Sequence, residues 1–131
     1  MGKQSTSCPC GSSLPYPTCC ARYLEGNETA PTAEALMRSR YTAYTQGRQD
    51  YLLATWHPST RPSAPLGLAD DTATKWLGLE VRRHEPRDAE HAIVEFVARY
   101  KVGGRAYRLH ETSRFVRESG RWFYVDGDMD A

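Results

Sequence analysis

Residues 91–126 read HAIVEFVARYKVGGRAYRLHETSRFVRESGRWFYVD, and apolar and polar side chains alternate along most of this length. A period of two is typical of β-strands that bury one face. Gly103-Gly104 and Ser119-Gly120 interrupt the alternation at places where two-residue hairpin turns are expected. Together with the residues just before it, this segment predicts an antiparallel meander. Its strands are expected to span roughly Leu79–Glu85, His91–Val102, Ala106–Glu118 and Trp122–Asp126.

The two hairpin turns also predict which residues face each other across the strands. The expected pairs are Tyr100 with Tyr107, Ala98 with Leu109, Phe96 with Glu111, Val94 with Ser113, Arg117 with Trp122, Phe115 with Tyr124, and Ser113 with Asp126. Most of the large apolar members share one face, and this supports the register because a slip of one residue would turn them outward. The opposite face carries Arg99, Arg108, His110 and Arg114, and we expect it to be solvent-exposed.

The residues before the strands have the period of helices. Ala33–Gln46 is expected to form a helix with Thr32 as its N-cap and Gly47 at its end. Further short helices are predicted from about Asp50 to Trp56, and from Asp70 or Asp71 through Trp76. Helices followed by an antiparallel meander indicate an α+β domain, in which about three N-terminal helices pack on one side of a curved sheet.

Composition narrows the class of protein. The chain has 131 residues, of which 40% are hydrophobic and 25% are charged, and its formal net charge is +1. These values are typical of a folded globular domain and argue against general disorder. Because no apolar run approaches the ~18 residues that span a bilayer, no membrane span is predicted. The N-terminus lacks the apolar segment of a secretory signal, so we expect a cytoplasmic protein.

All the cysteines lie close together near the N-terminus, at Cys8, Cys10, Cys19 and Cys20. Two pairs of thiols joined by a short loop match the needs of a tetrahedral, fully coordinated Zn²⁺ site. Thr18 is expected to cap a short helix from Cys19 to Glu25, which would place two ligands in its first turn. A disulfide staple and a redox pair remain alternatives, although no export signal supports the first and the spacing is unusual for the second.

The segment CPCGSSLPYPTCC at residues 8–20 resembles a SEC-C motif, the zinc-binding module found at the end of the SecA translocation ATPase. The runs APTAEALMRSRYTAY at residues 30–44 and YLLATWHP at residues 51–58 are similar to the YchJ-like family of uncharacterised bacterial proteins. The resemblance implies a SEC-C motif joined to an NTF2-like domain, which often contains a cone-shaped cavity. It implies a zinc knuckle at residues 1–26, a linker at 27–32 and the NTF2-like domain at 33–131, with Zn²⁺ bound by the four cysteines.

The predicted register places polar side chains on the face that should form the core. Glu111, Ser113 and Asp126 share that face with Phe115 and Tyr124. A carboxylate is costly to bury unless it is paired or solvated, so these residues either have hydrogen-bond partners in a filled core or line a cavity. The pocket candidates are Glu111, Ser113, Asp126, Tyr124, Trp56 and His57.

Two functions compete at this point. The first is a zinc-binding protein-interaction module that contacts a protein partner through the knuckle, because a closed metal site suits presentation of a surface better than catalysis. The second is an NTF2-like small-molecule-binding protein or enzyme, with Glu111 as general base in the cone. An open cavity of roughly several hundred cubic ångströms that reaches Glu111 would favour the second. Nucleic acid is not an expected partner, because no aromatic residues are interleaved with Arg99, Arg108 and Arg114.

Overall fold

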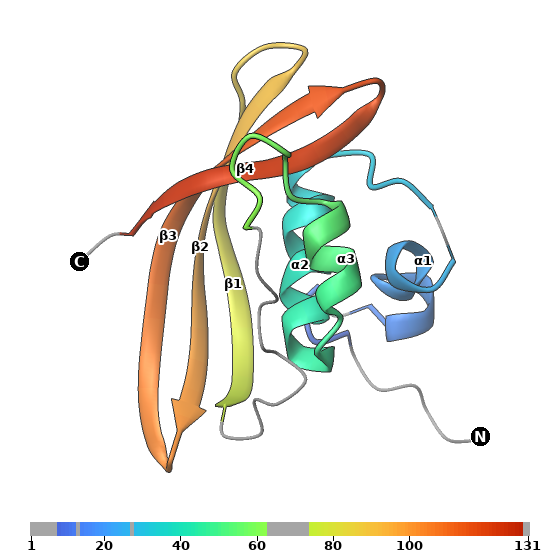
Figure 1. Ribbon diagram of the computed structural model, residues 1–131. Helices are drawn as coiled ribbons and strands as arrows, with labels where there is room; N and C mark the ends of the chain where they lie inside the picture. Colours follow the sequence, from blue (N-terminus) through green and yellow to red (C-terminus); the bar gives the residue numbers. More distant parts are fainter. Residues whose placement is uncertain (1–7, 13, 27, 63–73, 130–131) are drawn as a thin grey trace.

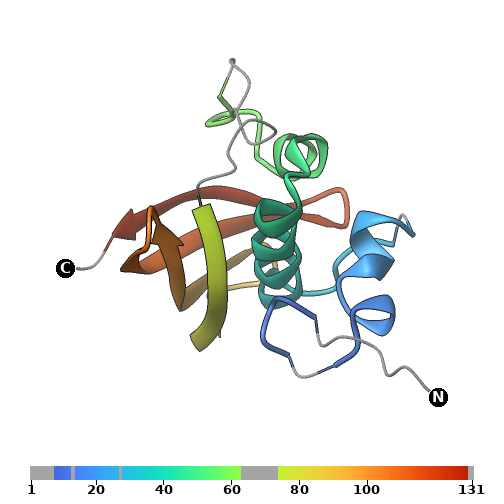
Figure 2. The ribbon, with the colours of Figure 1, turned by 90° about the horizontal axis from the view of Figure 1, so that it is seen from below.

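The computed structural model of the chain describes residues 8–12, 14–26, 28–62 and 74–129. The elements follow in the order η1 (Tyr16–Thr18), α1 (Ala21–Leu24), α2 (Ala33–Gln46), α3 (Gln49–Ala54), β1 (Thr74–Pro86), β2 (His91–Val102), β3 (Arg105–Glu118) and β4 (Arg121–Met129). The strands form an antiparallel sheet in the order β1-β2-β3-β4. The sheet curves around α2, and α2 lies between the sheet and the N-terminal segment (Figure 1, Figure 2). The predicted α+β fold with a curved antiparallel sheet is confirmed.

The long helix α2 begins and ends where the sequence predicts. The Thr32 side chain accepts a hydrogen bond from the backbone N–H of Ala35 at 3.0 Å, so it caps the helix as expected. Gly47 ends the helix in the left-handed region, with φ at 68°. Across the described part of the chain, none of the helices combines the length and the apolar composition needed to cross a membrane.

The next helix, α3, is present but ends at Ala54 rather than at the predicted Trp56. The chain leaves the helix at Thr55, whose carbonyl accepts a hydrogen bond from the N–H of Tyr124 in β4 at 2.9 Å. Trp56 then forms a β-bridge with the same tyrosine. Pairing with the backbone of β4 therefore replaces the last turn of the predicted helix.

The first strand starts earlier than predicted. The helix expected from Asp70 or Asp71 through Trp76 is wrong at residues 74–76, which begin β1, and its remaining residues lie outside the described ranges. Trp76 pairs with Tyr100 in the ladder between β1 and β2, and the two rings pack 5.3 Å apart. Long-range pairing thus overrides the local helix signal. The ladder of β1 is irregular at two places, between Trp76 and Gly78 and between Val81 and Arg83.

The hairpin of β2 and β3 has the predicted register. The confirmed pairs are Tyr100–Tyr107, Ala98–Leu109, Phe96–Glu111 and Val94–Ser113. Gly103 and Gly104 form the turn with φ at 59° and 82°, the positive values that the favoured two-residue hairpin turns require. As expected, Arg99, Arg108 and Arg114 are exposed on the outer face, whereas His110 on the same face is partly buried and lies 2.7 Å from Glu95.

The hairpin of β3 and β4 departs from the predicted register after two confirmed pairs, Arg117–Trp122 and Phe115–Tyr124. Val125 is an extra residue in β4, so Arg114 pairs with Asp126, and Ser113 pairs with Gly127. The predicted pair of Ser113 with Asp126 is therefore wrong. A bulge shifts the later residues of its strand by one position, which moves Asp126 to the outer face of the sheet.

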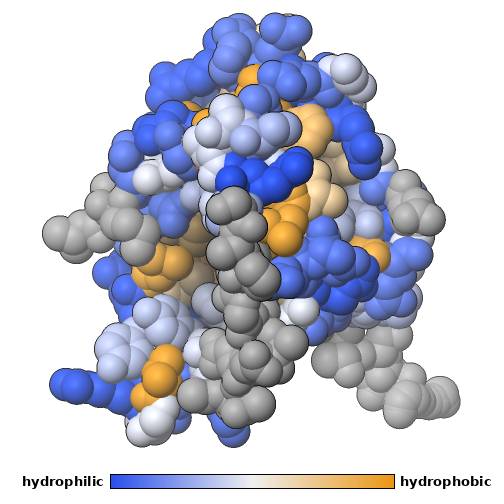
Figure 3. Space-filling model, viewed as in Figure 1, coloured by the Kyte–Doolittle hydropathy of each residue, from blue (hydrophilic) through white to orange (hydrophobic). Residues whose placement is uncertain are grey.

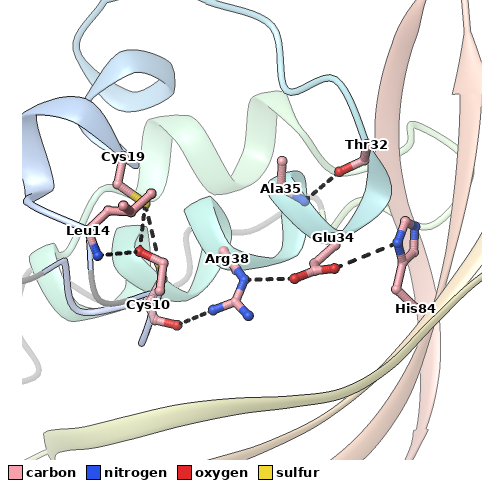
Figure 4. Close-up of polar contacts among 9 residues, drawn as sticks. Cys10, Leu14, Cys19, Thr32, Glu34, Ala35, Arg38 and His84 are labelled. Atoms are coloured by element: carbon pink, nitrogen blue, oxygen red, sulfur yellow. Dashed lines mark hydrogen bonds and ion pairs between the residues drawn. The ribbon is translucent and has the colours of Figure 1, made fainter.

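The N-terminal segment packs directly on α2. Its four cysteines belong to the same buried apolar cluster as Leu36 of that helix. The Arg38 guanidinium donates hydrogen bonds to the Cys10 carbonyl at 2.8 Å and to Glu34 at 3.0 Å, and Glu34 lies 3.7 Å from His84 of β1 (Figure 4). This row of contacts links the segment to the sheet through α2. The division of the chain into knuckle, linker and NTF2-like domain stays a prediction.

Gly11 brings the N-terminal segment close to the backbone of β1. Its φ is +81°, and a Cβ at this position would lie 2.5 Å from the carbonyl oxygen of Leu79. Because real Cβ atoms essentially never approach so closely, a side chain here would push the segment and the strand apart. Gly104 has nearly the same φ, +82°, but a Cβ there would meet nothing within 4 Å.

We expect Gly11→Ala to lower the free energy of unfolding more than Gly104→Ala, measured by urea denaturation. Both changes place an alanine in the left-handed region, which lowers the stability by about 1–2 kcal/mol. Only Gly11→Ala also adds a close contact, and this overpacking lowers the stability by about a further 1–3 kcal/mol. Gly104→Ala is the matched control for backbone strain. Equal losses in the two variants would show that the segment does not press on β1.

Candidate functional site

The four cysteine side chains form one buried cluster. Their Sγ atoms all lie within 4.8 Å of one another, and the Sγ atoms of Cys10 and Cys19 are 3.6 Å apart. All four thiols are free rather than joined in disulfides. In a tetrahedral Zn²⁺ site with Zn–S bonds of ~2.3 Å, the sulfur atoms lie about 3.8 Å apart. The donor set and its dimensions therefore fit a zinc ion.

Local turns bring these sulfurs together. The N–H of Gly11 donates to the Cys8 carbonyl at 3.2 Å and closes the turn that carries the first pair. In the second pair, Cys19 directly follows η1 and Cys20 directly precedes α1. The Ser12 hydroxyl lies 3.1 Å from the Sγ atom of Cys19, so the first turn also contacts the second pair.

The short helix expected from Cys19 to Glu25 is only Ala21–Leu24. The prediction that Thr18 caps this helix is wrong, because its hydroxyl donates to the Pro15 carbonyl at 3.2 Å within η1. The last two cysteines therefore flank the junction of η1 and α1 instead of lying in a first helical turn.

The sulfurs compete for protons inside the cluster. The pKa of Cys10 is lowered, chiefly because of a hydrogen bond with the side chain of Cys20. The pKa of Cys20 is raised, because of the same hydrogen bond and because its thiol is buried. Four thiolates can share this buried space only beside a cation, and a divalent metal ion supplies the required charge.

A second site lies between α2 and the inner face of the sheet. It is a cavity of about 260 Å³, which we call the cone cavity, and its walls are mostly aromatic. Of the pocket candidates, Glu111, Ser113, Tyr124 and Trp56 line it. Its lining also includes Met37, Arg40, Tyr41, Tyr44, Trp76, Phe96, Ala98, Leu109 and Phe115.

Two of the sequence candidates do not line the cone cavity. The bulge turns Asp126 outward, where its carboxylate pairs with the Arg114 guanidinium and its side chain is 49% exposed. His57 follows α3, and its ring lies 2.9 Å from Glu118 and 2.7 Å from the Ser59 hydroxyl. Both side chains therefore have partners outside the cavity.

Glu111 is the carboxylate of the cone cavity. Its Oε2 atom accepts hydrogen bonds from the Ser113 hydroxyl at 2.6 Å and from the Tyr124 hydroxyl at 3.3 Å. Gly127 lies next to this oxygen, and a Cβ at Gly127 would collide with it. The bulge that removes Asp126 from the cavity thus places a glycine where Glu111 needs space.

Arg40 is a pocket residue that the sequence analysis missed. It is only 5% exposed, and its Nη1 atom donates to the Leu52 carbonyl at 2.8 Å and to the Thr55 hydroxyl at 2.7 Å. Burial lowers the pKa of its guanidinium. Arg40 follows Leu36 by one helical turn, so its place on the apolar stripe of α2 could have revealed it.

The guanidinium of Arg40 is also stacked between aromatic rings. It lies 5.1 Å from the centre of the Trp56 ring and 4.6 Å from that of Tyr124. Those two rings meet edge to face with centres 5.2 Å apart. Trp56 Nε1 is buried and has no hydrogen-bond partner among the described residues. The contacts with Trp56 and Tyr124, together with the two hydrogen bonds, hold the guanidinium in place in the lining of the cavity.

A curved antiparallel sheet that encloses a cavity against a long helix, with an N-terminal cluster of four cysteines, defines a SEC-C-type protein with an NTF2-like domain. Residues 32–127 match the family described as the middle NTF2-like domain of YchJ. The chain belongs to this YchJ-like family.

Bacterial relatives agree with this assignment. A UPF0225 protein of Chromobacterium violaceum is 62% identical over 126 residues, which cover 92% of this chain and 91% of that protein. A UPF0225 protein of Cupriavidus pinatubonensis is 60% identical over 130 residues, covering 95% of this chain and 89% of the relative.

Solved structures share the fold. The solution structure of a SEC-C motif containing protein from Rhodopseudomonas palustris matches with a TM-score of 0.86 and 33% identity, covering 96% of this chain and 100% of the other. The crystal structure of a SEC-C motif containing protein from Psychrobacter arcticus matches with a TM-score of 0.81 and 30% identity, covering 96% and 84%. The crystal structure of a protein from Thiobacillus denitrificans, named as a calcium/calmodulin-dependent protein kinase type II association domain, matches with a TM-score of 0.60 and 19% identity, covering 78% of this chain and 96% of the other. At this identity the match shows a shared fold alone.

We expect Gly127→Ala to destabilise the protein by about 1 kcal/mol, because the end of the Glu111 side chain must move and its hydrogen bonds from Ser113 and Tyr124 weaken. The same change should cost much less in a Glu111→Ala background, because the colliding carboxylate is then absent. A double-mutant cycle in urea denaturation measures this coupling. Additive losses would show that Gly127 does not provide the space that Glu111 occupies.

Proposed function

We propose that this protein binds a small molecule in the cone cavity, and that its four cysteines hold one structural Zn²⁺ ion. The observation that carries the first part is the cavity of about 260 Å³ that reaches Glu111. A close-packed interior leaves few voids larger than a water molecule. Space of this size beside a carboxylate therefore favours a ligand site over a filled core.

The size and the lining also support this proposal. Ligand pockets of ~300–1,000 Å³ are mostly apolar with a few placed polar groups, and the cone cavity lies just below that range. Aromatic side chains dominate the walls, and Glu111 is the only carboxylate among the described lining residues. Binding is the better-supported role, and general-base action by Glu111 would require a ligand with an acidic proton beside it.

A structural role for the metal follows from the number of donors. Four thiolates complete a tetrahedral zinc site and leave no position for a substrate. The cluster sits against α2 and close to β1, so a bound ion would fasten residues 8–26 to the rest of the fold. Free thiols in such a cluster suit a reducing compartment, which supports our proposal that the protein is cytoplasmic.

Contact with a protein partner through the knuckle is a second proposal. Leu14, between the two cysteine pairs, is 50% exposed and is the observation in its favour. The face shown in Figure 3 is mostly hydrophilic, and its apolar side chains reach the surface in small separate areas. We rank this role behind ligand binding, because a single exposed leucine is common on the surface of a folded protein and does not by itself mark an interaction surface.

We expect native mass spectrometry to show one Zn²⁺ ion per chain, and none in the double variant Cys19→Ser, Cys20→Ser. Ser12→Ala keeps all four ligands and should retain the ion. On chelation, hydrogen exchange should rise across residues 8–26 while the sheet stays protected, because only this segment lacks a core of its own. Metal-free protein with intact disulfides, or cooperative loss of the whole fold on chelation, would contradict the proposal.

We expect Ala98→Leu to prevent binding of small aromatic probes, because Ala98 lines the cone cavity and a larger side chain would fill it. Saturation-transfer NMR with naphthalene and 2-naphthol measures binding. Ala106→Leu, on the exposed surface of β3, is the matched control and should bind as wild type does. If neither probe binds wild type, or Ala98→Leu binds both equally well, the cavity is not a site for small aromatic molecules.

A further inference from the structure

We infer that the occupant of the cone cavity is a neutral, planar aromatic molecule of about two fused rings that donates one O–H or N–H hydrogen bond to Oε1 of Glu111. This inference rests on the proposed function, since it names the class of ligand that the cavity would take. Three properties of the described lining residues lead to it: the size of the space, the hydrogen-bonding state of the carboxylate, and the balance of charge.

The size and the walls select a flat ring system. A dry cavity of about 150 Å³ accommodates benzene, so about 260 Å³ accommodates a bicyclic molecule. Tyr41 and Tyr44 of α2 pack against Trp76, with ring centres 5.5 Å and 5.9 Å from it. Phe96 of β2 and Phe115 of β3 also line the cavity. A planar aromatic ligand can contact these rings through stacked or edge-to-face arrangements.

The carboxylate selects a hydrogen-bond donor. Both hydrogen bonds that Glu111 accepts from described residues, from Ser113 and from Tyr124, go to its Oε2 atom. An ionised carboxylate accepts but does not donate, and its second oxygen has lone pairs available. The remaining oxygen, Oε1, can therefore accept a hydrogen bond from an O–H or N–H group on the ligand. Such a charge-assisted hydrogen bond is roughly twice as strong as one between neutral groups.

The charges around the cavity select a neutral ligand. Arg40 and Glu111 are the only charged side chains among the described lining residues, and their charges are opposite. A charged ligand would upset this balance in a poorly solvated space, which is unfavourable. Arg40 already donates through Nη1 to the Leu52 carbonyl and the Thr55 hydroxyl and lies over two aromatic rings, so turning toward an anion would cost these contacts.

Four probes with the same ring system test the inference on the full chain: 2-naphthol, naphthalene, 2-naphthoate and 1-naphthylmethylammonium. Titration by NMR gives their dissociation constants for wild type and for Glu111→Gln. We expect 2-naphthol to bind wild type about tenfold or more tightly than naphthalene, and more tightly than either ion. In Glu111→Gln this advantage over naphthalene should shrink about tenfold, while naphthalene binding stays within about twofold and shows that the cavity is intact.

The outcomes separate the two levels of the proposal. Equal binding of naphthalene and 2-naphthol to wild type, with both lost in Ala98→Leu, would overturn the hydrogen-bond donor and leave the ligand site standing. Tighter binding of 2-naphthoate or 1-naphthylmethylammonium would overturn the neutral ligand in the same way. Absence of binding by every probe would overturn the cavity as a site for molecules of this class and size.

Discussion

The carboxylate of Glu111 can occupy the inner face of the sheet only because β4 contains one residue more than a regular pairing would need. The extra residue, Val125, places Gly127 opposite Ser113, and a side chain at Gly127 would collide with the carboxylate. The same shift turns Asp126 outward, so the cavity contains one acidic side chain from this hairpin instead of two. Two carboxylates in one apolar space would repel each other and raise the cost of burial. The bulge therefore sets both the shape of the cavity and its charge.

The guanidinium of Arg40 complements this arrangement from the helical side. It connects α2 to α3 by hydrogen bonds to Leu52 and Thr55, and it stacks on the Tyr124 ring, whose hydroxyl reaches Glu111. A buried guanidinium needs partners for its N–H groups and compensation for its charge. Here the hydrogen bonds come from the helix connection, and the opposite charge comes from the sheet. Helices and sheet are thus coupled through polar groups in an otherwise apolar interior.

Much of the fold follows from local sequence signals. Thr32 and Gly47 predict the ends of α2, and Gly103-Gly104 predicts the register of β2 and β3, because each acts through nearby backbone geometry. The spacing of the cysteines predicts one thiol cluster for a similar reason, since short loops limit how far the sulfurs can separate. These features require no knowledge of the rest of the chain.

Most of the errors lie where distant segments meet; the exception is Thr18, whose hydroxyl bonds to the nearby Pro15 carbonyl instead of capping α1. Trp76 is in a strand because it pairs with Tyr100 of β2. Asp126 faces outward because β4 contains a bulge, and no turn residue in the sequence indicates where that bulge lies. The sequence analysis missed Arg40 because arginine side chains are rarely buried, although this one lies on the buried stripe of α2. Its burial depends on acceptors at Leu52 in α3 and at Thr55 just after it, and on the rings of Trp56 and Tyr124, which the tertiary structure brings together.

The two irregularities in β1 have a consequence for association. β1 lies at one border of the sheet, so one side of its backbone has no neighbouring strand among the described residues. A long, flat strand in that position is a template onto which a foreign chain can add. Interruptions at Trp76–Gly78 and Val81–Arg83 break the regular row of N–H and C=O groups, and Arg82 and Arg83 place charge beside it. These features disfavour the addition of a second chain along the free side of β1, although the same two shifts also interrupt its pairing with β2.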